Sequence, residues 1–223
     1  MNKKGVILLS SGLDSIVALD FARDFCEIKL ALTFDYGQKA AKEEIEASKK
    51  ICLKYDIPHK TIELPFLKEI TNNSLTNKDL NLEFEKSDEN SAKNVWVPNR
   101  NGLFANIGAS YAESFDYDYI IMGLNREEAE TFPDNSIDFI EKGTDLFKFS
   151  TLSHPEIYAP LYNLTKNEIV SIGVVRKVDF SLIRSCYDSS DNQKTHCGKC
   201  ESCIRLKNAL INTNNSDLLK IIF

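Results

Sequence analysis

A run of small polar residues near the amino end of the chain, Ser10–Ser15, has the composition of a phosphate-binding turn. The apolar run Val6–Leu9 comes directly before it and a helical pattern that begins at Ile16 comes directly after it, so the turn connects a buried strand to a helix. Backbone N–H groups of such a turn can approach an anion, and the amino end of the helix adds a positive dipole. Because no Gly-Lys-Ser/Thr ending is present, the turn is not a Walker loop for β- and γ-phosphates.

The turn resembles the SGGxDS loop of the ATP pyrophosphatases, which bind the pyrophosphate part of ATP while a substrate oxygen attacks the α-phosphate. Ser11 stands where that family usually carries glycine, and a serine with positive φ there costs on the order of 1–2 kcal/mol. The alternative is an ordinary strand-to-helix connection with Asp14 as N-cap. The resemblance implies that Asp14 and Ser15 are catalytic and that ATP is bound by Leu9, Ser10, Ser11, Gly12, Leu13, Asp14, Ser15, Ile16, Val17, Ala18 and Leu19.

A second group of reactive residues is a cluster of four cysteines in the C-terminal part of the chain, Cys186, Cys197, Cys200 and Cys203. Two-residue gaps with a glycine allow neighbouring sulfurs to reach one tetrahedral Zn²⁺, and four thiolates leave no open position for water. The cluster therefore predicts one structural zinc per chain. His196 could replace one thiol, and an iron–sulfur cluster is the other metal that four cysteines can hold. The remaining cysteines, Cys26 and Cys52, lie in apolar helical patterns and are expected to be buried.

Apolar runs and helical patterns alternate along the chain. This alternation predicts an α/β fold with a doubly wound parallel sheet, in which ligands bind at the carboxyl ends of the strands. The resemblance above implies a sheet of the adenine-nucleotide α-hydrolase type. The expected strands are Gly5–Ser10, Ile28–Phe34, Thr61–Leu64, Tyr119–Met122 and Glu156–Ala159, and the expected helices are Ile16–Phe25, Glu43–Tyr55, Leu103–Phe115, Ser136–Leu146 and Thr165–Lys177.

The domain organisation follows from length and composition. We expect an ATP pyrophosphatase domain over residues 1–180 and a small zinc-binding element with a closing helix over residues 181–223. The segment 65–97 is rich in Asn, Lys, Glu and Ser, so it is predicted to be a mobile flap over the site or a solvated surface insertion.

Charge and hydropathy limit the kinds of partner. The chain has 33 acidic and 27 basic residues, which argues against a protein whose main task is to grip nucleic acid. No stretch approaches the ~20 apolar residues of a membrane span, and the amino end lacks a signal peptide. The sequence therefore predicts a cytoplasmic protein with a small-molecule substrate, no nucleic acid and no membrane partner; a homodimer is expected.

Four further motifs narrow the family. Asp35–Gln38 follows the second strand, Val97–Asn101 opens a helix, and Ser185–Tyr187 precedes the cysteine-rich run Cys197–Arg205. With the phosphate turn, these motifs resemble the 7-cyano-7-deazaguanine synthases, the QueC family, over essentially the whole chain. The resemblance implies an ATP-dependent ligase. ATP and Mg²⁺ would adenylate 7-carboxy-7-deazaguanine, ammonia would give the amide, and a second ATP would activate the amide so that the nitrile forms.

Polar residues at the strand ends are candidates for the purine-like substrate: Asp35, Tyr36, Gln38, Arg100 and Asn125. Each has a simpler alternative, since Asp35 could cap a turn, Tyr36 could be core and Arg100 could pair with a surface carboxylate. Lys166 resembles a lysine at a helix start in the family and is assigned a catalytic role at a phosphate, with an exposed helix lysine as the alternative.

One segment departs from the resemblance. Arg126–Asn135 carries an acidic run where many members have glycine and tyrosine, although Pro133-Asp134 is kept. Three other functions therefore stay open: a related enzyme that adenylates a different carboxylate or amide, a tRNA-modifying enzyme of the same superfamily, and a zinc-stabilised nucleotide sensor without catalysis.

Overall fold

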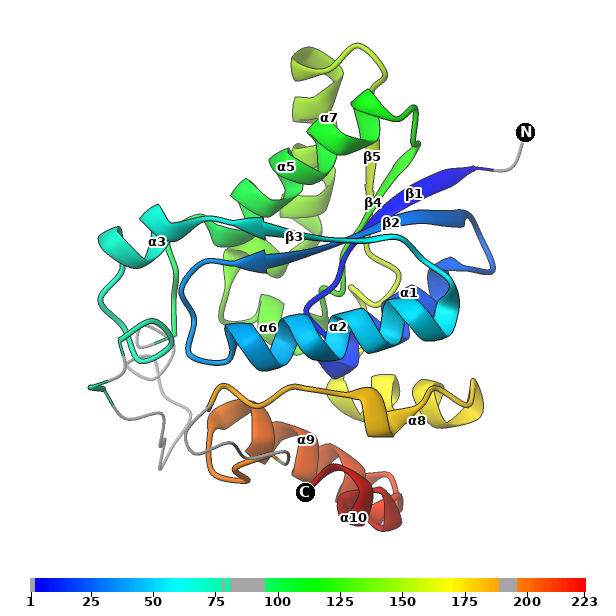
Figure 1. Cartoon of the computed structure of the whole chain (residues 1–223). Helices are drawn as coiled ribbons and strands as arrows, with labels where there is room; N and C mark the ends of the chain where they lie inside the picture. The colour runs from blue at the N-terminus through cyan, green and yellow to red at the C-terminus, as the bar shows by residue number, and fades with distance from the viewer. Residues whose placement is uncertain (1–2, 78, 81–94, 189–195) are drawn as a thin grey trace.

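The computed structural model describes residues 3–77, 79–80, 95–188 and 196–223. Its centre is a five-stranded sheet of parallel strands in the order β3-β2-β1-β4-β5 (Figure 1). This order places β1, which carries the phosphate turn, in the middle of the sheet. The predicted doubly wound parallel sheet is confirmed. The strands are β1 (Lys4–Leu8), β2 (Glu27–Asp35), β3 (His59–Glu63), β4 (Tyr119–Ile121) and β5 (Glu156–Tyr158).

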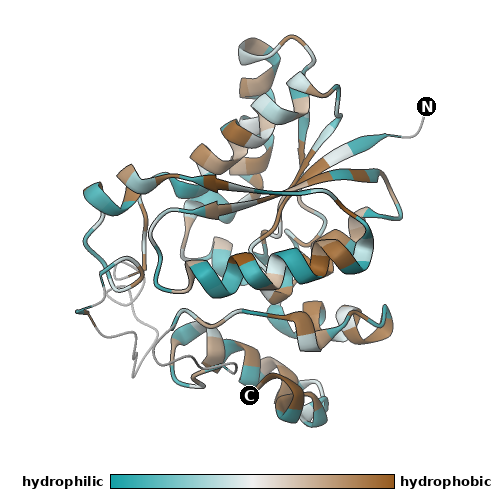
Figure 2. Cartoon of the chain, viewed as in Figure 1, coloured by the Kyte–Doolittle hydropathy of each residue, from teal (hydrophilic) through white to brown (hydrophobic). Residues whose placement is uncertain are grey.

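Helices cover both faces of the sheet. Alternate residues of β1 belong to two separate core clusters, because successive side chains of a strand point to opposite faces. One cluster joins the sheet to α1 (Leu13–Ala22), α2 (Ala41–Tyr55) and α8 (Lys166–Val175). The other joins it to α5 (Arg100–Ser114) and α7 (Ile137–Ser150). Figure 2 shows apolar residues concentrated in the central strands between these two layers.

All five predicted helices are present, with ends that differ by a few residues. The observed α5 begins at Arg100, about one turn before the predicted start at Leu103. The prediction was late because Arg100–Gly102 contains no apolar residue that would indicate a helix. A capping box begins α8: Thr165 Oγ1 accepts from the Glu168 N–H, and the Glu168 carboxylate accepts from the Thr165 N–H. None of the described helices is long and apolar enough to cross a membrane.

The C-terminal part packs tightly against the sheet domain. It contains η2 (Phe180–Leu182), α9 (Glu201–Asn212), η4 (Ser216–Leu218) and α10 (Leu219–Ile222). Leu206 and Leu210 of α9 lie in the same core cluster as Val17 of α1, and Cys186 and Cys203 lie in the other cluster. The sequence analysis expected one closing helix in this part and gave it no bounds; the described residues there form two α-helices, α9 and α10. The boundary between residues 180 and 181 stays a prediction, since both sides share one core.

The predicted flap over residues 65–97 is described at its two ends. It begins with α3 (Pro65–Ile70), and Leu67, Leu75 and Val97 are buried. Asn73 Nδ2 donates to the carbonyl oxygen of Trp96 at 2.7 Å, which ties the beginning of the segment to its end. Residues 78 and 81–94 lie outside the described residues, so the mobility of the flap stays a prediction. The remaining short helices are α6 (Arg126–Ala129) and η1 (Pro133–Asn135).

Candidate active site

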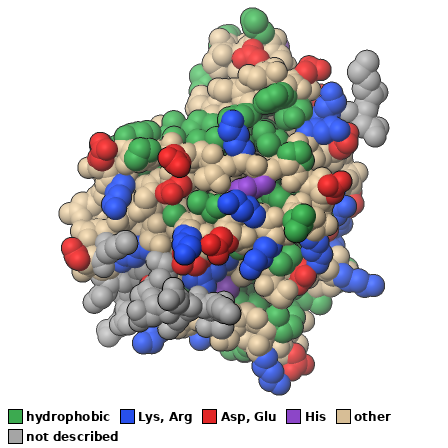
Figure 3. Space-filling view, viewed as in Figure 1, with side chains coloured by type: hydrophobic (Ala, Val, Ile, Leu, Met, Phe, Trp, Pro, Cys, Tyr) green, Lys and Arg blue, Asp and Glu red, His purple; other side chains and the backbone are tan. Residues whose placement is uncertain are grey.

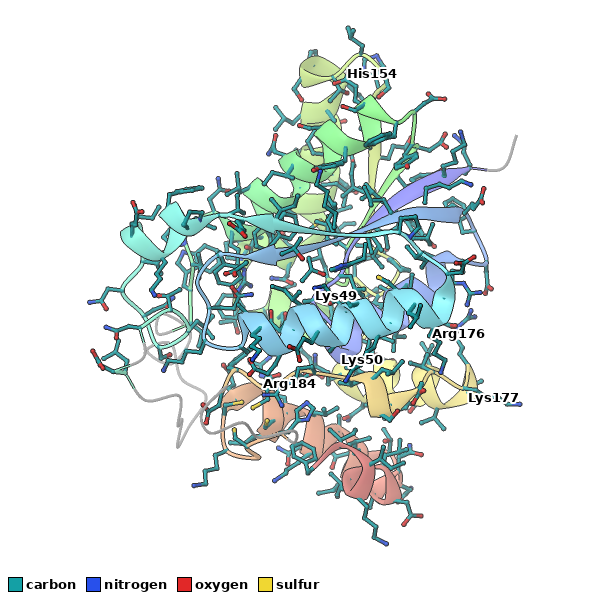
Figure 4. The ribbon with its side chains drawn as sticks, viewed as in Figure 1. Lys49, Lys50, His154, Arg176, Lys177 and Arg184 are labelled. Carbon is teal, nitrogen blue, oxygen red and sulfur yellow. The ribbon has the colours of Figure 1, made fainter. Side chains whose placement is uncertain are left out.

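The phosphate turn connects β1 to α1 at the carboxyl edge of the sheet. Ser11 has φ 61°, in the left-handed region, and its side chain is fully buried. Its carbonyl oxygen accepts from the Arg184 N–H at 2.8 Å, and Leu13 N–H donates to Ser185 Oγ at 3.2 Å. The turn is therefore held by a segment about 170 residues later in the chain, and Arg184 lies between α2 and α9 (Figure 4).

Gly12 gives a test of whether the turn fits a phosphate. Its φ of −67° and ψ of 160° suit any residue, and a Cβ there would only touch Ser10 Oγ at 3.5 Å and Ser185 Oγ at 3.7 Å. The packing of the chain itself thus does not demand glycine at this position. A ligand that approaches the backbone does demand it, because a side chain would fill the cradle at the amino end of α1. The turn fits a bound phosphate group.

Asp14 lies in the first turn of α1 and is the centre of a buried charge network. Its Oδ2 accepts from Lys166 Nζ at 2.5 Å and from Asn125 Nδ2 at 3.0 Å. Its Oδ1 is buried and has no hydrogen-bond partner among the described residues. Burial raises the pKa of the Asp14 carboxyl, against the opposing effects of Lys166 and Asn125. A buried carboxylate oxygen without a partner is costly, so Oδ1 is suited to a cation or a donor that the ligand brings.

Lys166 begins α8, and its side chain is 12% exposed. Besides Asp14, it contacts Glu128 Oε1 at 3.5 Å. Burial alone would lower the pKa of Lys166, but the carboxylates of Asp14 and Glu128 outweigh burial and raise it. The same ammonium group lowers the pKa of Glu128 against its burial. Lys166 is therefore a charged residue of the site and not an exposed helix lysine.

A close approach between β4 and α1 brings the network together. A Cβ on Gly123, which follows β4, would lie 2.8 Å from the backbone of Asp14 and Ser15, so only glycine permits this contact. Two residues later, Asn125 is fully buried and is the N-cap of α6, with Oδ1 accepting from the Glu128 N–H at 2.9 Å. Asn125 therefore positions Asp14 and Glu128 through its two amide atoms. The structure assigns it this positioning role, and direct contact with substrate stays a prediction.

A cavity, called the first cavity below, opens in front of the phosphate turn between the ends of β1, β2 and β4 and the beginning of α5. Tyr36 and Arg100 line it together with Asp14 and Lys166. Arg100 Nη1 donates to Tyr36 Oη at 3.1 Å, and the guanidinium lies 5.6 Å from the centre of the Tyr36 ring. Within the described part of the chain, Arg100 forms no ion pair with a carboxylate, so the surface pairing considered from sequence is not observed.

Asp35 and Gln38, also predicted to contact substrate, lie outside the first cavity. Asp35 Oδ1 accepts from the Gly37 N–H at 3.0 Å, which is the turn-capping alternative. Gln38 is buried and uses both amide atoms: Oε1 accepts from the Tyr36 N–H, and Nε2 donates to Glu44 Oε2 at 3.0 Å. Both residues shape the end of β2, so their contact with substrate stays a prediction that the geometry does not favour.

The eleven residues assigned to ATP from the resemblance fall into two groups. Side chains from the turn and the first turn of α1 reach the first cavity, whereas Ser11 and the following residues of α1 are buried beneath it. ATP contact by the buried group stays a prediction. Those that line the cavity are Leu9, Ser10, Gly12, Leu13, Asp14 and Ser15, and those of the buried group are Ser11, Ile16, Val17, Ala18 and Leu19.

The four clustered cysteines meet at one point beside α9. The Sγ atoms of Cys186, Cys197, Cys200 and Cys203 all lie within 4.8 Å of one another, and those of Cys197 and Cys203 are 3.9 Å apart. Tetrahedral thiolate coordination of zinc requires sulfur–sulfur distances of about 3.8 Å. Cys197 Sγ also accepts from the Cys200 N–H at 3.3 Å, and such donors stabilise thiolates. The cluster therefore fits a metal ion with four sulfur ligands.

His196 lies beside the cysteine cluster but is used elsewhere. Its Nε2 accepts from the Ser185 N–H at 3.0 Å, and its Nδ1 lies 3.0 Å from the carbonyl oxygen of Ile222. Burial lowers the pKa of His196, which favours the neutral ring that this arrangement needs. The ring therefore fastens α10 to the segment that holds the phosphate turn, and the metal site is left to the four cysteines.

Comparison with known proteins decides the family. The family model described as "Queuosine biosynthesis protein QueC" matches residues 4–214. This chain belongs to the QueC family. A 7-cyano-7-deazaguanine synthase from Carboxydothermus hydrogenoformans is 48% identical over 93% of this chain and 98% of that protein. Proteins of the same name from Bdellovibrio bacteriovorus (46% identical, 96% and 95% covered) and Methanocaldococcus jannaschii (41%, 98% and 99%) are also similar.

The structure adds residues that sequence reasoning missed in this QueC family member. Glu44 of α2 lines the first cavity, and burial raises the pKa of its carboxyl to about 7. Glu128, Ser185 and Tyr187 also line it. Glu128 stood in the acidic run that departs from many members, and Ser185-Cys186-Tyr187 was recognised only as a motif. Nothing in the pattern of α2 distinguishes Glu44 from the surface glutamates beside it.

Proposed function

We propose that this chain converts 7-carboxy-7-deazaguanine and ammonia to 7-cyano-7-deazaguanine, with two molecules of ATP cleaved to AMP and pyrophosphate. The family and the names of its relatives support the overall reaction. The observation that carries the proposal is the position of Lys166, a buried ammonium group at the border between the phosphate turn and the space beyond it. Adenylation of an acid requires such a cation where the carboxylate meets the α-phosphate.

ATP binds in the first cavity under this proposal. The phosphate turn supplies backbone N–H groups and the hydroxyls of Ser10 and Ser15 for the pyrophosphate part. The cavity continues past Phe34 and Met122, which offer apolar surface to the adenosine part. This arrangement leaves the α-phosphate near Asp14 and Lys166.

Mg²⁺ is the cation expected with ATP, and the donor set suits it. Asp14 Oδ1 is buried without a partner, and Glu128 brings a second carboxylate to the same network. Hard oxygen ligands of this kind are those that Mg²⁺ takes together with phosphate oxygens. When bound, the ion would neutralise charge on the phosphates; Asp14 and Glu128 are the residues that would hold it.

The protein's own residues orient the reactants and need no nucleophilic side chain. Lys166 neutralises charge that develops between the attacking carboxylate and the α-phosphate, and Arg100 binds the carboxylate of the acid. Asn125 holds Asp14 against Lys166, so the ammonium group is fixed before substrate arrives. The same placement serves the second activation, in which the amide oxygen replaces the carboxylate.

The metal of the cysteine cluster is proposed to be zinc, with a structural role. Four sulfur ligands close the coordination shell, and the cluster is buried except for Cys197. Its function is to fix the segment that holds the phosphate turn, in which the Arg184 N–H donates to the Ser11 carbonyl oxygen and Ser185 Oγ accepts from the Leu13 N–H.

The proposed partners are small molecules. On the face shown in Figure 3, basic and acidic side chains are interspersed, which does not favour a nucleic-acid surface. A cytoplasmic location is part of the proposal, and the four clustered thiols support it because such a cluster holds a metal in a reducing compartment. The homodimer stays a prediction.

The test is a reaction followed by mass spectrometry. Purified protein is incubated with ATP, Mg²⁺, ammonium and 7-carboxy-7-deazaguanine, and the amide and nitrile are expected with one AMP released per step. Omission of ammonium should leave an adenylate or AMP without either product. ATP cleavage that is independent of the deazapurine acid would refute the proposal.

A further inference from the structure

A second cavity adjoins the first on the side away from β2. It is lined by Val95–Val97, by Phe132 and Asp134 at the beginning of η1, and by the beginning of α9. The phosphate turn does not line this second cavity. Six residues line both cavities, so the two are continuous: Arg100, Glu128, Asn135, Lys166, Tyr187 and Ser202.

The shared residues include two cations, Arg100 and Lys166. Arg100 and Lys166 stand at the border, so an anionic group that reaches in from the second cavity meets them in front of the phosphate turn. A reaction that joins an acid to the α-phosphate of ATP needs two ligands whose reactive ends meet at one point. The two continuous cavities provide that arrangement, since ATP is tied to the first cavity by its phosphates.

The walls of the second cavity suit a flat heteroaromatic ring with N–H donors. The rings of Trp96 and Phe132 are nearly parallel, at 9°, with centres 5.7 Å apart, and both line the cavity. Such aromatic surface favours stacking of a planar ring. Three carboxylates also line the cavity, but Glu201 is paired with Arg205 at 2.7 Å and Glu128 with Lys166 at 3.5 Å. The third is Asp134.

Asp134 is the best placed acceptor of the three. Its Oδ1 accepts from Asn135 Nδ2 at 3.0 Å, and the Asn101 N–H at the beginning of α5 also donates to its carboxylate. These two bonds orient the group, and an ionised carboxylate has about four lone-pair sites, so further sites remain for a ligand.

We propose that the second cavity binds the acid substrate, a planar aminopyrimidinone carboxylic acid, and that Asp134 selects it by accepting hydrogen bonds from its ring N–H and amino groups. The inference rests on the proposed function and assigns the place and the specificity residue for that substrate. The ring stacks on the wall formed by Trp96 and Phe132, and the carboxylate points to Arg100 and Lys166.

Trp96 makes the first arm of the test direct, because it is the single tryptophan of the chain. Its emission is recorded while 7-carboxy-7-deazaguanine is added, alone and with α,β-methylene-ATP present. The acid is expected to give a saturable change in emission, and the ATP analogue alone is expected to give none. A Trp96→Phe variant supplies the background signal.

The second arm measures selectivity with the analogue of the acid that lacks the 2-amino group. Wild-type protein should prefer the complete acid by about tenfold or more, since the analogue leaves an acceptor of Asp134 unpaired. Asp134→Asn keeps an oxygen for Asn135 and Asn101 but turns the other acceptor into a donor, so the preference should fall below about threefold. Asp138→Asn, an exposed neighbour in α7, is the matched control and should keep the full preference.

The outcomes separate the inference from the proposed function. If the enzyme makes the nitrile while the acid leaves Trp96 emission unchanged in both titrations, the second cavity is not its site and only the inference fails. The same holds if Asp134→Asn retains the wild-type preference. If the acid neither binds nor reacts, the proposed function fails as well. Should Asp134→Asn not fold, the wild-type titrations still decide the location.

Discussion

The phosphate turn and the cysteine cluster are both short runs of the chain, but they obtain their partners in different ways. Three of the four sulfur ligands lie within Cys197–Cys203, and backbone N–H donors to sulfur come from the same run. Asp14 of the phosphate site instead takes its partners from Lys166 and Asn125, 152 and 111 residues away. The cysteine cluster is therefore a local site, whereas the phosphate site is assembled by the fold.

This difference determines how each site responds to change. A local metal site contributes its binding energy to folding, so loss of one ligand affects the whole C-terminal part. An assembled charge network lies on an already folded sheet, so a change there affects chemistry first and stability second. The following predictions test this contrast, from the largest expected effect to the smallest.

Cys200→Ser should produce the largest effect. Removal of one sulfur from a closed site lowers metal affinity, and the buried cluster then lacks the energy that holds α9 and the segment before Cys186. We expect metal analysis to give about one zinc per chain for the wild type and little for the variant. The variant should be poorly soluble or unfold at a much lower temperature. Cys26→Ser, at a buried cysteine outside the cluster, is the control and should retain the metal.

A zinc-free wild-type preparation with unchanged melting temperature would contradict this prediction. Iron in place of zinc would leave the local character of the site intact but change the identity of its metal.

Asp14→Asn should leave the fold intact and reduce AMP formation by at least ~100-fold, the scale of one lost transition-state contact. The amide keeps an oxygen for Asn125 Nδ2 but removes the charge that holds Lys166 and any Mg²⁺. Far-ultraviolet circular dichroism should match that of the wild type. Asp24→Asn, at an exposed carboxylate just beyond α1, provides the matched control and should turn over normally. Normal turnover by Asp14→Asn would refute the assignment.

The same contrast explains what sequence reasoning could and could not predict. The strands, five helices and metal ligands follow from periodicity and from residue type at short spacing. The contact of Lys166 with Asp14 depends on the order of strands in the sheet and on Gly123, neither of which a pattern reveals. The closing helix expected in residues 181–223 was given no bounds, so α9, with its apolar spacing at Leu206 and Leu210, was not located from the sequence.

Substrate contacts were the weakest prediction for a related reason. Polar residues at a strand end can face the ligand or can satisfy the backbone of the turn, and composition does not separate these roles. Gln38 uses both amide atoms in hydrogen bonds to Tyr36 and Glu44, whereas Arg100 lines the cavity. The hydrogen-bond partners of each side chain separate the two roles, and these partners are known only from the three-dimensional structure.

Glu44→Gln should change the pH dependence of stability. The folded-state pKa of Glu44, about 7, lies above its ordinary value of 4.5 because of burial, so the folded chain holds this proton more tightly. The resulting stabilisation is complete below pH 4.5 and is lost as pH rises through 7. Relative to Glu44→Gln, the wild type should therefore lose roughly 1–3 kcal/mol between pH 5 and pH 8 in urea unfolding. Parallel pH profiles of the two proteins would contradict this.

The smallest effect is expected for Ser11→Gly, which restores the residue typical of the phosphate turn. The left-handed backbone of Ser11, φ 61°, costs serine on the order of 1 kcal/mol that glycine avoids. Two effects oppose this gain: glycine has more freedom in the unfolded chain, and the bond from Ser11 Oγ to the Ser10 carbonyl oxygen is lost. We therefore expect a change in unfolding free energy of less than about 1 kcal/mol.

Ser11→Val is the matched contrast, because a β-branched side chain is strained at positive φ and the site is fully buried. It should be destabilised and should also bind ATP more weakly, since the phosphate turn depends on this backbone. If Ser11→Gly bound ATP much more tightly than wild type, the serine would be a constraint on nucleotide binding rather than a tolerated departure.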